Sequence, residues 1–177
     1  MNGKVKEYDE KGNLIFDGEY LNGKMNGKVK EYAYHWVDLS KIKDKHFLKG
    51  ERNKEMKWNY FDKLIIECDY LNDQKHGKRK VYNNDILILE EEYLKGKLNG
   101  LVKNYHAKGP LIFEGYYSNN IKNGNAKEYN YENGVLIFEG RYKKGKKDGP
   151  AKEYDEKGNL IFEGEYKNGM KKERKNS

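Results

Sequence analysis

Two stretches of this chain are nearly identical although they lie far apart. GNLIFDGEYLNG fills residues 12–23 and GNLIFEGEYKNG fills residues 158–169, and ten of the twelve positions agree. A phrase that recurs in this way indicates repeated supersecondary units that bury apolar side chains against their neighbours. Aligned on the final tyrosine, residues 1–170 divide into about seven units, of which the second and third are degenerate, and a charged tail follows at 171–177. The units begin near Asn2, Asn26, Asn53, His76, Asn99, Asn123 and Asp148.

Each unit is predicted to contain two short strands. In the last unit the first strand reads AKEY (151–154) and the second reads LIFEGEY (160–166). Side chains alternate between the two faces of a strand, so Phe162, Gly164 and Tyr166 share one face and the acidic residues between them share the other. No run has the length or period of a helix. The expected fold class is therefore all-β: an elongated single-layer antiparallel sheet of about seven β-hairpins, twisted into a groove.

The predicted turns agree with this meander. Asn-Gly occurs seven times, and these residues tolerate the positive φ that a type I′ hairpin turn needs at both central positions. LNGK (21–24) and KNGM (167–170) fit two-residue turns between units. DEKGN, at 9–13 and again at 155–159, fits a longer loop within a unit, with its glycine in the left-handed conformation.

A glycine recurs between the two aromatic residues of the second strand. The structural glycines are Gly18, Gly115, Gly140 and Gly164. Glycine inside a strand marks either a bulge or a place where another group packs closely over the backbone. We expect an aromatic ring from a neighbouring strand to occupy this space, and a simple bulge is the alternative. In the third unit Cys68 takes the same position with a small apolar side chain.

At FEGRYKKGKKDG (138–149) and FEGEYKNGMK (162–171) the sequence resembles the MORN repeat. The resemblance is closest to the bacterial variant form, in which KEY follows the second glycine. It implies an elongated sheet of hairpins that serves scaffolding, self-association or phospholipid contact. Bacterial proteins of the variant form are often labelled antitoxins or immunity proteins, which neutralise a cognate toxin by binding it. The resemblance thus implies a protein partner, possible anionic lipid contact, and no catalytic residues.

The sequence offers little for catalysis. Threonine is absent, and the three serines lie in no nucleophile motif. The four histidines show no metal-ligand spacing, and Cys68 stands alone, so we expect neither a metal site nor a disulfide. We predict a non-enzymatic protein without a cofactor. Because no apolar run approaches the roughly 20 residues of a membrane span, and the start has no apolar signal core, a cytoplasmic location is expected.

The charge pattern suggests where a partner binds. The net charge of +7 favours acidic proteins or anionic lipid, whereas nucleic acid is disfavoured because the inward aromatic residues offer no stacking platform. Acidic residues are expected to form a strip on one face. Lysines at the turns should form a basic rim along one edge, although a merely solvated surface would have the same composition. The rim candidates are Lys24, Lys97, Lys143, Lys144, Lys146, Lys147, Lys171 and Lys172.

The degenerate second unit is the most individual part of the chain. Tyr34, His35 and Trp36, with Trp58 nearby, could form an exposed aromatic patch that binds a partner. They could instead fill space left by the lost Leu-Ile-Phe phrase. The first strand could also expose an unpaired edge, which would allow a homodimer through this terminal edge strand, whereas the charged tail at 171–177 should discourage pairing at the other end.

Overall fold

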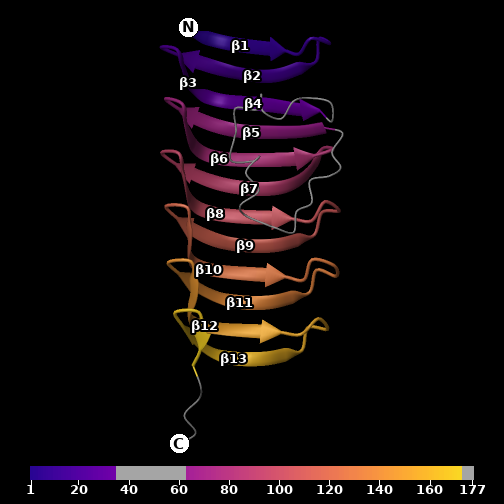
Figure 1. Ribbon diagram of the computed structural model, residues 1–177, viewed down its shortest axis with the longest axis vertical. Coiled ribbons are helices and arrows are strands. Elements are labelled where there is room, and N and C mark those ends of the chain that lie inside the picture. Colours follow the sequence, from indigo (N-terminus) through magenta and orange to yellow (C-terminus); the bar gives the residue numbers. More distant parts are fainter. Residues whose placement is uncertain (35–62, 173–177) are drawn as a thin grey trace, which may run out of the picture.

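The computed structural model describes residues 1–34 and 63–172, which form one antiparallel sheet without a helix. Figure 1 shows the strands stacked along the long axis of the molecule, with β1 and β13 at opposite ends. The 14 strands are β1 (Gly3–Tyr8), β2 (Leu14–Leu21), β3 (Lys24–Met25), β4 (Gly27–Tyr34), β5 (Lys63–Leu71), β6 (Gln74–Asn83), β7 (Ile86–Leu94), β8 (Lys97–Tyr105), β9 (Leu111–Ser118), β10 (Ile121–Tyr129), β11 (Leu136–Lys143), β12 (Lys146–Tyr154), β13 (Leu160–Lys167) and β14 (Met170–Lys171). The predicted single-layer antiparallel sheet is confirmed.

Neighbouring strands of the sheet follow one another in the chain, apart from the short β3, which pairs with β2 only. Strands β4 and β5 pair along their whole length, from Gly27 opposite Tyr70 to Tyr34 opposite Lys63. This strand pair combines a strand of the expected second unit with a strand of the expected third unit. The residues between them, 35–62, lie outside the described residues, so the division into seven units stays a prediction.

The turns between hairpins have the geometry that LNGK and KNGM predict. Asn22 and Gly23 have φ angles of 53° and 75°, and Asn168 and Gly169 have 52° and 88°. Both central residues of a type I′ turn are therefore left-handed, which matches the twist of the flanking strands. The same conformation recurs in turns without Asn-Gly, because Lys95 and its counterparts are also held at positive φ.

Not every Asn-Gly pair makes a turn. Asn123 and Gly124 lie inside β10, at an irregularity of the pairing with β9, and Gly124 has a φ of 126°. The Asn123 side chain instead accepts the backbone N–H of Lys144 in the next turn, at 3.5 Å. Asp148 accepts the N–H of Asn168 in the same way, at 3.1 Å. These side chains connect each turn to the next one along the edge of the sheet.

The loops within hairpins lie at the opposite edge. In DEKGN, the carboxylate of Asp9 accepts the backbone N–H groups of Lys11 and Asn13 at 2.9 Å and 2.7 Å, and Gly12 has a φ of 83°. The second copy of this loop repeats the arrangement around Asp155. The predicted left-handed glycine is confirmed in both copies.

The repeated glycine makes room for a ring, but the ring does not come from a neighbouring strand. A Cβ at Gly140 would lie 2.8 Å from Cζ of Phe138, two residues earlier in the same strand, and 2.7 Å from Cβ of Ala151 across the sheet. The ring of Phe138 lies along its own strand because Gly140, two residues later on the same face, has no side chain. Its ring then meets Tyr142 edge-on, with the ring centroids 5.8 Å apart. The expectation of a cross-strand ring was therefore wrong.

The same correction applies to all four structural glycines. At each one the nearest ring is the phenylalanine two residues earlier: Phe16 at Gly18, Phe113 at Gly115, Phe138 at Gly140 and Phe162 at Gly164. The sheet face that carries these four rings is called the aromatic face below. It forms the core of the fold, since Phe16, Leu98 and Phe138 are exposed by 2% or less.

One hairpin has a charged pair at the glycine position and the residue that faces it. In β6–β7, Glu91 occupies the glycine position and lies directly opposite Arg79. Their side chains form an ion pair of 2.7 Å, and each is 2% exposed. The hydroxyl of Tyr93 also donates to Glu91, at 3.0 Å. A buried pair of this kind holds its geometry because separating the charges would leave one unpaired in the core.

Candidate partner-binding surfaces

The face opposite the aromatic face, called the charged face, carries one continuous row of alternating charges. The pairing registers place one member on each strand from β1 to β13 except β3, and every lysine lies opposite an acid on each strand that its own strand pairs with in the ladder. This charge ladder consists, in order, of Lys6, Asp17, Lys30, Glu67, Lys80, Glu90, Lys103, Glu114, Lys127, Glu139, Lys152 and Glu163. The expected acidic strip is therefore wrong, because first-strand lysines fill the gaps between the acids.

The lysines and acids of the charge ladder pair with one another. Within each of its six hairpins, the lysine and the acid form an ion pair, from 2.7 Å for Lys30–Glu67 to 3.5 Å for Lys127–Glu139. Burial alone would raise the pKa of Glu90, but hydrogen bonds from Lys80 and Tyr105 outweigh burial and lower it. Each exposed pair contributes little, typically below about 1 kcal/mol. Because the pairs repeat regularly, this face has almost no net charge. Positions that break the pattern of lysine opposite acid can therefore be identified.

A second row runs beside the charge ladder and differs between the two halves of the molecule. In the N-terminal half it repeats lysine opposite acid: Lys4 with Glu19, Lys28 with Asp69, and Lys78 with Glu92. In the C-terminal half the same positions carry Leu101 opposite Tyr116, Asn125 opposite Arg141, and Pro150 opposite Glu165. The residues Leu101, Tyr116, Asn125, Arg141 and Pro150 are called the anchor patch below.

Shallow grooves lie over both halves of the charged face. The groove over the C-terminal half is lined by all five residues of the anchor patch together with ladder residues from Glu114 to Glu163. The groove over the N-terminal half is lined by ladder and second-row charges, including Lys28 and Asp69. Tyr116 is 50% exposed and supplies the aromatic ring that lines the C-terminal groove. The C-terminal groove is thus the less charged of the two.

The structure separates the predicted basic rim into two groups. Lys24, Lys97, Lys143, Lys144 and Lys146 are exposed at the turns between hairpins. Lys147 and Lys171 instead turn onto the aromatic face and pair with Glu153, at 3.2 Å and 2.7 Å, and Lys172 pairs with Glu165 at 2.8 Å. The predicted rim is therefore wrong for Lys147 and Lys171.

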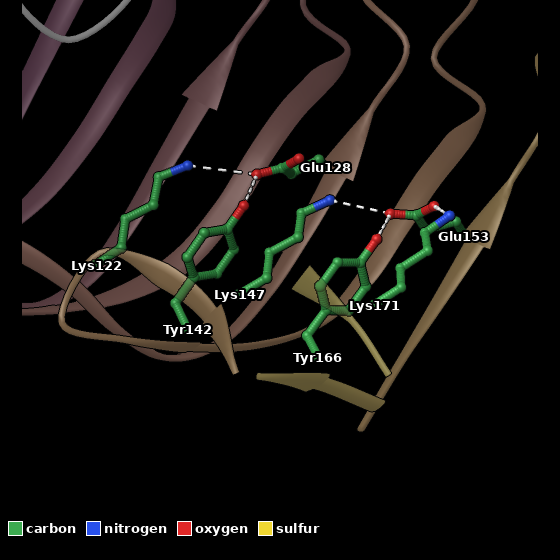
Figure 2. Close-up of polar contacts among 7 residues, drawn as sticks. All are labelled: Lys122, Glu128, Tyr142, Lys147, Glu153, Tyr166 and Lys171. Carbon is green, nitrogen blue, oxygen red and sulfur yellow. Dashed lines mark hydrogen bonds and ion pairs between the residues drawn. The ribbon is translucent and has the colours of Figure 1, made fainter. Parts of the chain in front are cut away.

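Lysine, glutamate and tyrosine form a repeated cluster on the aromatic face. Figure 2 shows Lys122 and Tyr142 converging on Glu128, and beside them Lys147, Lys171 and Tyr166 converging on Glu153. Each lysine also lies over a phenylalanine ring of the preceding hairpin. Nζ of Lys122 is 4.1 Å from the centroid of Phe113, and Nζ of Lys147 is 3.7 Å from that of Phe138.

The clusters cover the rings of a sheet that has only one layer. Burial, followed by the hydrogen bond to Glu128, raises the pKa of Tyr142 well above its ordinary value. Burial alone would raise the pKa of Glu153, but hydrogen bonds from Lys171, Tyr166 and Lys147 outweigh burial and lower it to about 2. The lysine stems and cation–π contacts therefore shield the aromatic face in this half of the molecule. This arrangement leaves the charged face and the turn edge as surfaces for a partner.

The turn edge also carries exposed apolar side chains, which the sequence interpretation missed. One large apolar residue stands beside five of the six described turns between hairpins: Leu21, Leu71, Leu94, Ile121 and Met170, each between 46% and 72% exposed. Leu21 and Leu94 lie directly opposite Lys24 and Lys97. The edge is therefore mixed apolar and basic. The recurrence of an apolar residue next to these five turns was a usable sequence signal.

The predicted aromatic patch is largely untested. His35, Trp36 and Trp58 lie outside the described residues. Tyr34 is half-buried at the end of β4, and its hydroxyl donates to the backbone carbonyl of Leu14 at 3.4 Å. Strand β1 pairs only with β2 among the described residues, so self-association through this edge also stays a prediction.

The described residues show no group of histidine, cysteine, aspartate and glutamate side chains that could hold a metal ion. A search of residues 1–34 and 63–172 also finds no helix suited to spanning a membrane. The anchor patch and the Lys-Glu-Tyr clusters were missed by sequence reasoning. Aligning the units could have identified Tyr116 and Arg141, since both replace an acid of the repeat.

Comparison with known proteins gives one finding. A family model described as MORN repeat variant matches residues 1–22, 122–144 and 147–168. The matched segments contain the intact Phe-Gly-Tyr phrases of β2, β11 and β13. A search of curated proteins returns no match.

Proposed function

Because the chain is a MORN-repeat protein, we propose that it is a non-enzymatic protein-binding repeat that captures its partner along the charged face. Proteins of this family generally bind other proteins or membrane lipids and are not catalytic. The groove of the C-terminal half carries the proposal, because an exposed tyrosine and an arginine stand where the repeat otherwise has acids. Tyrosine and arginine are among the residues that are enriched at the energetically dominant contacts of protein interfaces.

The form of the molecule supports binding along an extended surface. Adjacent turns are connected by hydrogen bonds such as Gly145 N–H to the carbonyl of Lys122, 2.9 Å, and Gly169 N–H to that of Lys147, 2.8 Å. The sheet is therefore a pre-formed platform, and binding to it does not require ordering of the described backbone. Pre-organised surfaces bind more tightly because less conformational entropy is lost on association.

The finer proposal is that the partner is a toxin and that this protein is its antitoxin or immunity protein. Support comes from the resemblance to the bacterial variant form, whose members often neutralise a toxin by binding it. Neutralisation would be steric: the chain would cover the toxin surface and contribute no chemistry of its own.

Co-purification from the native cell tests the proposal. The tagged chain should recover one protein partner in stoichiometric amount, and a Tyr116→Ala/Arg141→Gln double variant should lose it. A Lys4→Gln/Lys28→Gln variant serves as the control, because it changes exposed charges of the second row outside the anchor patch. If the recovered partner inhibits growth when expressed alone and the chain relieves that inhibition, the toxin proposal stands. Recovery of no protein by either form would contradict protein capture.

A peripheral membrane role is the second candidate, and the turn edge favours it. Exposed Leu21, Leu94 and Met170 stand among exposed lysines, and apolar side chains next to basic ones are typical of surfaces that enter the interface of an anionic bilayer. Sedimentation with anionic vesicles should then fall at high salt and in a Leu21→Ser/Leu94→Ser variant. Sedimentation that is absent, or equal with neutral vesicles, would contradict it.

A further inference from the structure

The anchor patch is a local break in an otherwise regular pattern. At its two strand pairs, the sheet replaces lysine opposite acid by Leu101 opposite Tyr116 and by Asn125 opposite Arg141. Both partners change together in each case, so the patch loses two acid–base pairings and gains one apolar pair. Such a coordinated departure is unnecessary for the fold, because the N-terminal half forms the same hairpins with charges at these positions.

Arg141 is the exposed cation of this patch. The residue directly opposite Arg141 on the adjacent strand β10 is Asn125, whose side chain is an uncharged amide. Among the described residues, no carboxylate lies within ion-pair distance of Arg141. The nearest acid of the same row, Glu165, pairs with Lys172 at 2.8 Å. The ladder lysines on either side, Lys127 and Lys152, are paired as well. The guanidinium of Arg141 is therefore the donor group that the groove offers to a ligand.

We propose that the anchor patch binds an extended protein segment of the partner through one carboxylate and one apolar side chain. The carboxylate would be held by Arg141, whose planar group matches a carboxylate with two parallel N–H donors. The apolar side chain would pack on Leu101 and the exposed ring of Tyr116. This inference rests on the proposed function and specifies its binding site and partner chemistry.

The geometry of the sheet sets the spacing of the two groups. Tyr116 on β9 and Arg141 on β11 are two strands apart, which corresponds to roughly 9.6 Å at the usual spacing of strands. An extended segment advances about 3.1 to 3.4 Å per residue, so three residues cover this distance. The preferred ligand has its apolar residue and its acidic residue three positions apart and lies across the strands, along the long axis of the molecule.

Synthetic peptides test the inference on the full chain. One pool fixes leucine and aspartate three positions apart among glycine, serine and glutamine, a second replaces the aspartate by asparagine, and a third replaces it by lysine. Fluorescence anisotropy should show that the aspartate pool binds about tenfold more tightly than the asparagine pool, the usual effect of a charge-assisted contact. Arg141→Gln should abolish this preference, and Tyr116→Ala should weaken both pools alike.

A charge reversal makes the test independent of folding defects. Arg141→Glu should transfer the preference from the aspartate pool to the lysine pool, which an unfolded variant cannot do. Lys78→Gln, on the same row in the other groove, should leave the preference unchanged. Equal binding of the aspartate and asparagine pools by the unaltered chain, or Arg141-dependent binding of anionic vesicles or single-stranded DNA in place of peptide, would overturn the inference. A captured native partner that tolerates Arg141→Gln would overturn it too, while leaving the proposed protein-binding function intact.

Discussion

Tyr142 on β11 donates a hydrogen bond of 2.7 Å to the carboxylate of Glu128 on the adjacent strand β10. The same contact recurs one hairpin later between Tyr166 and Glu153. In both cases a lysine six residues before the glutamate completes the cluster. The aromatic face of this single-layer sheet is thus closed by polar side chains that pair among themselves, and this is how a chain with 37% charged residues makes a core.

Tyr142→Phe should destabilise the fold by about 1–2 kcal/mol, because it keeps the ring and removes only the donor to Glu128. The half-buried carboxylate would retain Lys122, at 3.4 Å, as its remaining partner. Urea unfolding followed by circular dichroism measures the difference. Tyr129→Phe, at a half-buried tyrosine on the opposite face, is the matched control. Equal losses in the two variants would contradict a specific role of the Tyr142 hydroxyl.

Glu153 should make stability depend on pH in the acid range. Its pKa is lowered from an ordinary value of 4.5 to about 2, so the unfolded chain binds the proton more tightly than the folded one. The stabilisation is fully present above about pH 4.5 and is lost as the pH falls towards 2, by roughly 3 kcal/mol in total. Melting temperatures measured across this window should fall less steeply for Glu153→Gln. Glu163→Gln is the control, because Glu163 is exposed on the charged face, and its melting temperature should fall with pH as steeply as that of the unaltered chain. If the melting temperature of Glu153→Gln falls in parallel with that of the unaltered chain, Glu153 is not the source of the pH dependence.

Gly140→Ala should cost more stability than Gly164→Ala. A Cβ at Gly140 would lie 2.7 Å from Cβ of Ala151 and 2.8 Å from the Phe138 ring, and Ala151 is fixed on the neighbouring strand. At Gly164 the close contact, 2.9 Å, is only with the ring end of Phe162, which is half-buried and able to move. We expect a loss of about 1–3 kcal/mol for Gly140→Ala, as for overpacking in a core, and less than 1 kcal/mol for Gly164→Ala. Thermal unfolding of both variants measures the two losses. A larger loss for Gly164→Ala than for Gly140→Ala would contradict the role of the close contact with Ala151.

Lys127→Glu should destabilise the fold, because it interrupts the charge ladder. This substitution places like charges beside Glu114 and Glu139, which lie directly opposite on the two flanking strands. The expected loss is about 1 kcal/mol at low salt, shrinking at high salt because exposed charges are screened. Lys127→Gln separates repulsion from the mere loss of attraction and should cost less. A loss for Lys127→Glu that does not change with salt would indicate a packing effect instead.

The sequence by itself determined the repeated hairpins. The recurrence of Leu-Ile-Phe-x-Gly-x-Tyr with strand alternation required one face to bury rings, and the turns LNGK and KNGM required left-handed residues at Asn22 and Asn168. These are local properties: φ preference and side-chain period act within a few residues, so they can be derived without knowing which strands meet.

Only the tertiary structure decided where the lysines and acids point. Pairing register placed Lys127 between Glu114 and Glu139, which turned an expected acidic strip into a ladder, and it brought Lys147 back over Phe138 towards Glu153 instead of out to the rim. The direction of the phenylalanine rings along their own strands was also settled only there. Each of these outcomes depends on which partners lie within a few ångströms across strands, and charge or ring contacts at that range are set by register and not by composition.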